Sequence, residues 1–200
     1  MIFLAGVLIG ISFDDFKIND IFEDIQRNEI DTESYYAEQL FTEIFGGDKC
    51  ELAKPRVDVL SNELIEIGQT LTRYESKNIF REGEYTYLKQ KYFLLEIKLY
   101  MLLKELREQC DGFSEDVIIL YFYDQEQDAS LRQGFILDSF VKKGESIHVF
   151  SIDRNFEGGQ VPLVETVKKY YNITKSPTLI INYNVKKEGF VSAEELEKFF

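Results

Sequence analysis

Three side chains in this sequence have the chemistry for nucleophilic, redox or metal-binding work: two cysteines, Cys50 and Cys110, and one histidine, His148. A cysteine pair can form a structural disulfide, exchange disulfides through a thiolate, or contribute to a tetrahedral zinc site. Neither cysteine has a further Cys or His close to it in the sequence, so a zinc site would lack ligands. The sequence therefore predicts no metal site, and the cysteines are candidates for a disulfide or for redox chemistry.

His148 stands among apolar residues, Ile147, Val149 and Phe150, in a segment with the composition of a β-strand. Acid–base or nucleophilic catalysis needs a histidine that faces a Ser or Cys nucleophile and an acid in a cleft. The residues around His148 indicate no such partner. We interpret it as a histidine on one face of a sheet.

Acidic residues cluster in loops that follow predicted strands. They are Asp124, Glu126, Asp128 and Asp153. Ligand sites of α/β proteins usually lie at the carboxyl ends of strands, so a cation site is conceivable here, whereas solvated loop acids and acids near a helix N-terminus explain the same residues. The sequence has no glycine-rich phosphate loop and no His-Glu-x-x-His motif, and we predict no cofactor.

The composition bounds the class of protein. The chain has 200 residues, is 44% hydrophobic and 14% aromatic, and carries a net charge of −13. This length allows a substantial core in one or two domains. Binding of nucleic acid needs clustered Lys and Arg, which this acidic chain lacks, so we expect no nucleic-acid partner. The acidity either solvates the surface or offers a docking face to a basic partner.

The first thirteen residues, 1–13, carry no charge, and Asp14 and Asp15 follow at once. A helix needs about 20 apolar residues to cross a bilayer, and a secretory signal also has a basic first part. We interpret residues 1–13 as part of a longer signal anchor; the h-region of a cleaved signal and a buried helix of a soluble protein are the alternatives. An anchor followed by acidic residues predicts a membrane-anchored protein on the extracytoplasmic side, or a secreted protein if the segment is cleaved.

Residues 14–112 have strong helical periodicity and little β signal, and they predict an α-helical bundle of about three helices. The expected helices cover residues 18–45, 55–77 and 84–109, each with an apolar stripe typical of a core face. A second apolar stripe in the third helix predicts that it lies in the centre or also packs against the C-terminal domain. That stripe comprises Phe93, Ile97, Tyr100 and Leu103.

The two cysteines lie at matching places in this bundle. Cys50 falls in the turn after the first expected helix and Cys110 just past the end of the third, so an up-down-up arrangement brings both to the same end. We predict a structural disulfide, which closes a loop of about 60 residues and contributes roughly 4 kcal/mol in the chain-entropy description. Such a bond implies an oxidising compartment. Two free thiols, or a redox-active pair, are the alternatives.

Residues 113–200 alternate strand and helix patterns and predict an α/β domain. The first strand, helix and second strand form a β-α-β unit, which implies a parallel strand pair. The expected elements are strands at 117–123 and 146–153, helices at 129–142 and 161–171, a strand after Ser176-Pro177-Thr178, and a helix from Ser192. Within this region Asn172-Ile173-Thr174 matches the N-glycosylation sequon, which matters only in a secreted chain of a glycosylating host.

This pattern resembles the C-terminal half of the thioredoxin fold, and its most specific element is Ser176-Pro177-Thr178 before an apolar strand. In thioredoxin-like proteins that proline is cis and faces the redox site, a Cys-x-x-Cys motif at the start of the helix after the first core strand. The helix N-terminus there favours the thiolate. In this chain residues 111–200 contain no cysteine, and the resemblance places Gln127 and Ser130 at the two cysteine positions.

The resemblance implies a thioredoxin-like domain, with a central mixed sheet flanked by helices. It also implies that this domain does not carry out thiol–disulfide exchange, because that exchange requires a thiolate. The expected function is non-catalytic binding of a protein or peptide, or scaffolding of another cell-envelope protein. An extended peptide would pair with the backbone beside Ser176, Pro177 and Thr178 by strand addition. The alternative is a thiol–disulfide oxidoreductase or isomerase that uses Cys50 and Cys110.

Overall fold

The computed structural model describes residues 33–44, 46–77, 82–111, 116–144, 147–156 and 161–200. The chain divides into two compact units, Met1–Thr70 and Leu71–Phe200, and each is described by itself. Residues 1–13, which the sequence predicts to be an anchor, lie outside the described part. Among the described residues no helix is long and apolar enough to cross a bilayer.

The first unit contains a helix at residues 33–44 and most of α2 (Lys49–Lys77). α2 begins before Pro55, so the predicted start at this proline was wrong, and Cys50 lies in the first turn of α2 rather than in a preceding loop. The Asp48 carboxylate explains the earlier start. Its Oδ1 atom accepts hydrogen bonds from the backbone N–H groups of Cys50 (2.8 Å) and Glu51 (3.3 Å), which caps the helix.

The second unit begins with the end of α2 and with α3 (Glu82–Gln109), which is connected to it by side-chain hydrogen bonds. The Tyr74 hydroxyl donates to Glu84 (3.0 Å), and the Tyr85 hydroxyl donates to Glu75 (2.8 Å). The second apolar stripe of α3 is buried. α3 belongs to the same compact unit as the sheet. The predicted domain boundary between residues 112 and 113 stays a prediction.

A four-stranded mixed sheet follows α3, in the order β2-β1-β3-β4. β1 (Val117–Tyr123) pairs in parallel with β2 (Ile147–Asp153) and antiparallel with β3 (Thr178–Ile181), which pairs antiparallel with β4 (Val185–Glu188). The predicted parallel strand pair is confirmed. β4 was not predicted as a strand, because its sequence, Val-Lys-Lys-Glu, lacks the alternation of a half-buried strand.

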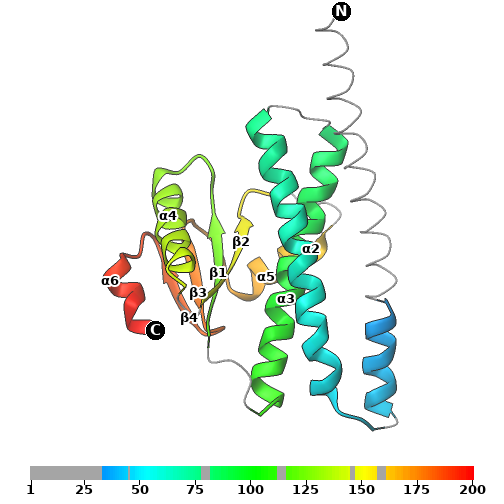
Figure 1. Ribbon diagram of the computed structural model, residues 1–200. Coiled ribbons are helices and arrows are strands. Elements are labelled where there is room, and N and C mark those ends of the chain that lie inside the picture. The colour runs from blue at the N-terminus through cyan, green and yellow to red at the C-terminus, as the bar shows by residue number, and fades with distance from the viewer. Residues whose placement is uncertain (1–32, 45, 78–81, 112–115, 145–146, 157–160) are drawn as a thin grey trace, which may run out of the picture. The chain divides into compact units, whose positions relative to one another are not determined.

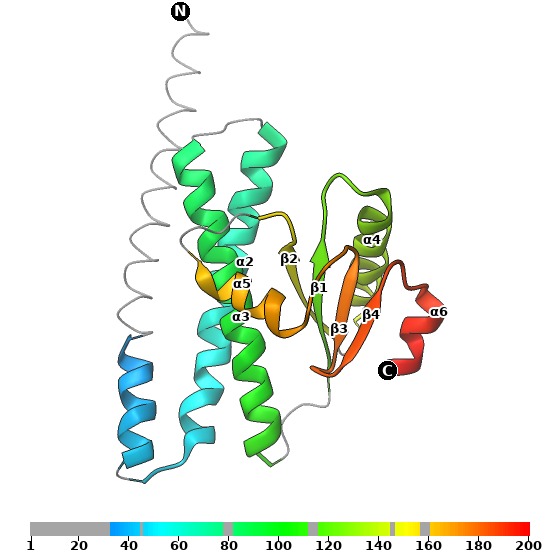
Figure 2. The same ribbon diagram turned by 180° about the vertical axis from the view of Figure 1, so that it is seen from behind.

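Helices cover both faces of the sheet (Figures 1 and 2). One face packs against α4 (Asp128–Lys142) and α6 (Ala193–Leu196), which is followed by a 3-10 turn, η1 (Glu197–Phe199). The core on this side includes Leu137 and Phe140 of α4 and Leu196 of α6. The other side is covered by α3 and by α5 (Pro162–Tyr170), which contact each other. The domain therefore has three layers, helix, sheet and helix.

The second apolar stripe of α3 faces the sheet. This is the second of the two predicted arrangements, in which α3 also packs against the C-terminal domain. Tyr100 packs edge-on against Phe150 of β2, with ring centroids 5.9 Å apart, and Phe93 packs edge-on against Phe156 at 4.9 Å. Tyr100 also donates or accepts a hydrogen bond with the Tyr171 hydroxyl at the end of α5 (2.7 Å). α3 is thus fixed to the edge strand β2 and to α5 together.

A buried carboxyl group, Glu96 of α3, contacts the outer edge of β2. Its Oε2 atom accepts a hydrogen bond from the Ser151 backbone N–H (2.8 Å), and the Tyr92 hydroxyl donates a second one. Burial raises the pKa of Glu96 well above 4.5, although both hydrogen bonds act in the opposite direction. An unpaired edge-strand N–H is a template for unwanted strand pairing, and Glu96 satisfies one such group.

We expect Glu96→Ala to lower the free energy of unfolding by roughly 2 to 4 kcal/mol, because it leaves the Ser151 N–H without an acceptor and opens a cavity. Urea unfolding of the full chain measures this. The control is Glu108→Ala on the same helix, where an exposed ion pair with Lys104 is lost and a change below about 0.5 kcal/mol is expected. Equal effects of the two substitutions would contradict the role given to Glu96.

Glu96 also predicts a pH dependence. Because its pKa in the folded protein is raised, the folded state keeps a proton that the unfolded chain loses above about pH 4.5, so this group's contribution to stability falls as the pH rises towards the folded-state pKa. Tyr92 and Tyr123, which interact with Glu96, have pKa values raised above their usual 10 and stay neutral in this range. Glu96→Gln should therefore gain stability relative to the native chain between pH 5 and pH 8 in urea titrations; a constant difference would contradict this.

Candidate functional site

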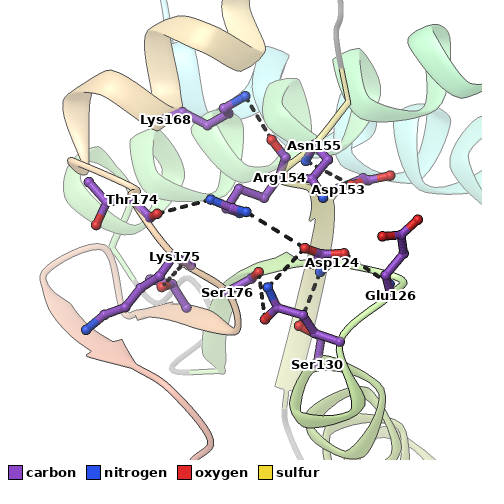
Figure 3. A network of polar contacts seen from close by, with 12 residues as sticks. Asp124, Glu126, Ser130, Asp153, Arg154, Asn155, Lys168, Thr174, Lys175 and Ser176 are labelled. Carbon is purple, nitrogen blue, oxygen red and sulfur yellow. Dashed lines mark hydrogen bonds and ion pairs between the residues drawn. The ribbon is translucent and has the colours of Figure 1, made fainter.

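The candidate site lies at the end of the sheet where β1 and β2 finish and β3 begins (Figure 3). Asp124 follows β1 and organises the loop into α4. Its backbone C=O accepts from the Gln127 N–H (3.1 Å), and its Oδ1 atom accepts from the Glu126 N–H (3.0 Å). The hydrogen bond from the Glu126 N–H, with smaller contributions from Asn155 and Arg154, lowers the pKa of Asp124. This carboxylate is a structural anchor that is 6% exposed.

Gln127, one of the two positions that the sequence resemblance aligns with the redox cysteines, is the N-cap residue of α4. Its side chain connects two loops instead of capping the helix. The Nε2 atom donates to Asp124 Oδ2 (3.0 Å), and the Oε1 atom accepts from the Ser176 hydroxyl (3.2 Å). Gln127 therefore holds the start of α4 against the loop that precedes β3.

Ser130, the other equivalent position, is almost completely buried, at 1% exposure. Its hydroxyl oxygen accepts a hydrogen bond from the Asp124 backbone N–H (3.2 Å), and its carbonyl accepts one from the Tyr121 hydroxyl (2.5 Å). Gln127 and Ser130 are the N-cap and third residues of one helical turn, positions whose side chains are neighbours. These two positions carry a half-buried amide and a buried hydroxyl.

The loop before β3 contains a cis peptide bond between Ser176 and Pro177. Pro177 and Thr178 are buried: the Pro177 carbonyl accepts from the Gly189 N–H (2.8 Å), and the Thr178 hydroxyl donates to the Lys175 carbonyl (2.8 Å). Ser176 is half-buried. Within the described part of the chain, its backbone N–H and C=O make no hydrogen bond, and only its hydroxyl does.

Arg154, which sequence reasoning did not single out, connects the loop after β2 with the loop after β1 and the loop before β3 (Figure 3). Its guanidinium forms an ion pair with Asp124 (3.7 Å) and donates to the Thr174 carbonyl (3.0 Å), while its own carbonyl accepts from Lys168 Nζ (3.0 Å). The sequence carried a signal that could have found it. Arg154 directly follows β2, and parallel β1 and β2 end at the same edge of the sheet, so Arg154 is expected near the residue that follows β1.

Two of the other acidic residues that the sequence marked as conceivable cation ligands, Asp128 and Asp153, have basic partners. Lys89 pairs with Asp153 (3.1 Å) and Arg132 with Asp128 (3.0 Å), and the Glu126 backbone belongs to the Asp124 turn. Across the described ranges, no three Cys, His, Asp or Glu side chains lie close enough to hold a metal ion. His148 is exposed and lies 3.0 Å from Asp116, away from the loops of the site.

The arrangement of the strands decides the fold family. A β-α-β unit followed by a helix, a β-hairpin and a last helix, with β3 antiparallel to the other three strands, is the topology implied by the sequence resemblance. Residues 117–200 form a thioredoxin-like domain. The predicted fold class, this domain after a helical region, is therefore confirmed.

Comparisons with known proteins add little to this assignment. No protein-family model matches the sequence, and no curated protein is significantly similar to it. The similar solved structures include thioredoxin-2 of the malaria parasite, described as a component of malaria parasite protein secretion machinery (26% identity, 40% of this chain and 77% of that one), and another malarial protein (25% identity, 42% and 92%). Both TM-scores are 0.34, so the thioredoxin-like assignment rests on the topology of the sheet.

The cysteines are outside the thioredoxin-like domain. Cys50 and Cys110 are disulfide-bonded, and neither is free, so the predicted disulfide is confirmed. Cys110 follows the last residue of α3 and is 9% exposed. An attacking thiolate needs access to a disulfide sulfur, and the burial of Cys110 restricts that access.

The geometry predicts that a redox site can be restored. Gln127→Cys combined with Ser130→Cys should place two thiols on adjacent side chains at the N-terminus of α4, where the helix dipole favours a thiolate. We expect this variant to form a second, readily reduced disulfide and to reduce insulin in the presence of dithiothreitol, whereas the native chain should give no turnover above dithiothreitol alone.

The single variant Gln127→Cys is the matched control, because it has a reactive thiol but no partner. It should be alkylated by iodoacetamide without catalysing insulin reduction. Turnover by the native chain would contradict the loss of redox function. A double variant whose thiols do not form a bond would contradict the equivalence of Gln127 and Ser130 with the two cysteines.

Proposed function

We propose that this protein is a non-catalytic binding module, in which the thioredoxin-like domain holds an extended segment of a partner protein by strand addition at Ser176. The observation that carries the proposal is the unpaired backbone of Ser176: an N–H and a C=O that make no hydrogen bond within the described structure, in a loop fixed on both sides. Such a pair of groups is what an extended peptide requires for main-chain pairing. Pro177 and Thr178, which follow Ser176 in this loop, are buried.

The loop is pre-organised for binding. Gln127 accepts from the Ser176 hydroxyl, Arg154 holds the Thr174 carbonyl, and the Gly189 N–H holds the Pro177 carbonyl. A loop that is already ordered loses little conformational entropy when a ligand binds, so more of the interaction energy appears as affinity. These contacts favour capture of a peptide without a preceding rearrangement.

Exposed apolar side chains on α4, the helix whose N-cap residue Gln127 bonds Ser176, indicate the chemistry of the partner. Leu131 and Phe135 follow Gln127 at successive steps of four on α4, and they are 51% and 73% exposed. Phe190 lies in the loop after β4, 44% exposed, with the Arg132 guanidinium 5.1 Å from its ring centre. We propose that the bound segment is extended and places an apolar side chain against Leu131.

The proposal places the protein on the extracytoplasmic side of a membrane or outside the cell, as a component of the cell envelope. The disulfide between Cys50 and Cys110 supports an oxidising compartment, since such bonds are rare where thiols are kept reduced. The absence of any cysteine from residues 111–200 supports binding over thiol–disulfide exchange.

The test is NMR titration of the full chain with unstructured peptides of Ser and Ala that carry one central Leu. We expect the Ser176 amide resonance to shift and its hydrogen exchange to slow. A peptide with an N-methyl group at the paired position should not bind, because it cannot donate a main-chain hydrogen bond. Resonance shifts that leave Ser176 unaffected, or equal binding of the N-methylated peptide, would overturn the proposed mode of binding.

The contribution of the apolar surface is tested with two matched variants of α4. Leu131→Asp should weaken peptide binding about tenfold, the loss expected for one apolar contact worth about 1.4 kcal/mol. Val141→Asp is the control, since Val141 is a similarly exposed apolar residue (46%) near the other end of the helix, and it should leave the affinity unchanged. Equal effects would show that charge, not contact, explains the loss.

A further inference from the structure

The chain contains one Asn-x-Ser/Thr sequence, Asn172-Ile173-Thr174, and the structure places it in the turn after α5. Asn172 ends this helix in the left-handed conformation, with φ +50°. Its N–H donates to the Lys169 carbonyl (3.1 Å), and the Ile173 N–H donates to the Lys168 carbonyl (2.8 Å). This pair of hydrogen bonds is the Schellman arrangement of a helix C-terminus, which favours Gly or Asn at the left-handed position.

The functional groups of the sequence are accessible. Asn172 and Thr174 are both exposed, whereas Ile173 between them is half-buried. Within the described residues, neither the Asn172 side-chain amide nor the Thr174 hydroxyl makes a hydrogen bond; only the backbone carbonyls of these two residues accept, from Lys186 and Arg154. The backbone conformation of Asn172 is therefore fixed by the fold, while its amide remains available for modification.

We propose that Asn172 is a site of N-linked glycosylation, with a lipid-pyrophosphate-linked oligosaccharide as the sugar donor. The Asn172 Nδ2 atom forms a bond to the anomeric carbon of the first sugar as the bond from that carbon to the pyrophosphate oxygen breaks. The lipid pyrophosphate leaves with the electron pair, and Nδ2 loses one proton to a base of the transferase. The disulfide between Cys50 and Cys110 is an independent observation in support, because disulfide formation and this modification occur in extracytoplasmic compartments.

The position of Asn172 gives the sugar a structural consequence. The Asn172 carbonyl accepts a hydrogen bond from Lys186 Nζ (2.8 Å), and Lys186 belongs to β4, an edge strand of the sheet. A glycan attached here emerges beside that edge and hinders pairing of β4 with a strand of another molecule. This inference does not depend on the proposed binding of peptides.

The experiment expresses the full chain behind a cleavable secretion signal in a glycosylating eukaryotic cell. Only molecules with a formed Cys50–Cys110 disulfide are scored, since that bond shows that they reached the oxidising compartment. We expect a slower band in gel electrophoresis that peptide N-glycosidase converts to the unmodified mobility, and mass spectrometry should locate the modification on the peptide that contains Asn172. Disulfide-bonded chains without this modification would overturn the proposal.

Four variants make the test specific. Asn172→Asp should abolish the shift and fold normally, because Asp tolerates the left-handed conformation better than most residues. Thr174→Ala should abolish it, and Thr174→Ser, which keeps the hydroxyl, should retain it. Asn184→Gln changes an exposed asparagine outside the sequon and should leave the shift intact. A shift that persists in Asn172→Asp would refute Asn172 as the acceptor.

Discussion

The register of β1 against its two neighbours is the constraint on which the candidate site depends. Tyr123 lies opposite Asp153 on one side, and Phe122 lies opposite Thr178 on the other. This pairing brings the residues that follow or precede these positions, Asp124, Arg154 and Ser176, to one edge of the sheet. A shift of one residue would reverse the faces of β1, whose first six residues are buried, so the core itself maintains the site.

At that edge a polar network connects three loops. An ion pair and several hydrogen bonds join the ends of β1 and β2 to the loop before β3, and Gln127 and Ser130 are part of that network. Ser176 is the exception within this network, since its backbone N–H and C=O have no partner in the described structure.

α3 protects a different part of the sheet, its lateral edge at strand β2, by a different interaction. Glu96 satisfies the Ser151 N–H inside a buried environment, and Tyr100 and Phe93 add aromatic contacts with Phe150 and Phe156. Burying a carboxyl group is costly unless its hydrogen bonds are satisfied, and the raised pKa of Glu96 is the sign of that cost. Helix α3 therefore covers and satisfies the β2 edge of the α/β domain.

The sequence by itself indicated most of the elements. Apolar periodicity located α3, α4 and the core strands, Ser192 marked the last helix, and residues 111–200 contain no cysteine. These features depend on local pattern and residue type, which a sequence displays directly. Local signals were less reliable where a neighbouring group sets the start of a helix. Pro55 indicated a helix start, but α2 begins earlier, at Lys49, because Asp48 caps it.

Only the tertiary structure decided which distant residues meet. β4 is a strand because β3 offers it a partner, and the turn between them holds Asn182 and Tyr183 in the left-handed conformation, with the Asn182 side chain accepting from the Ile118 N–H (3.0 Å). The contacts of Arg154 with Asp124, of Glu96 with Ser151 and of Gln127 with Ser176 span 30, 55 and 49 residues in sequence. Each depends on strand order and register, which are set by the packing of the whole core and leave no local signature in the residues themselves.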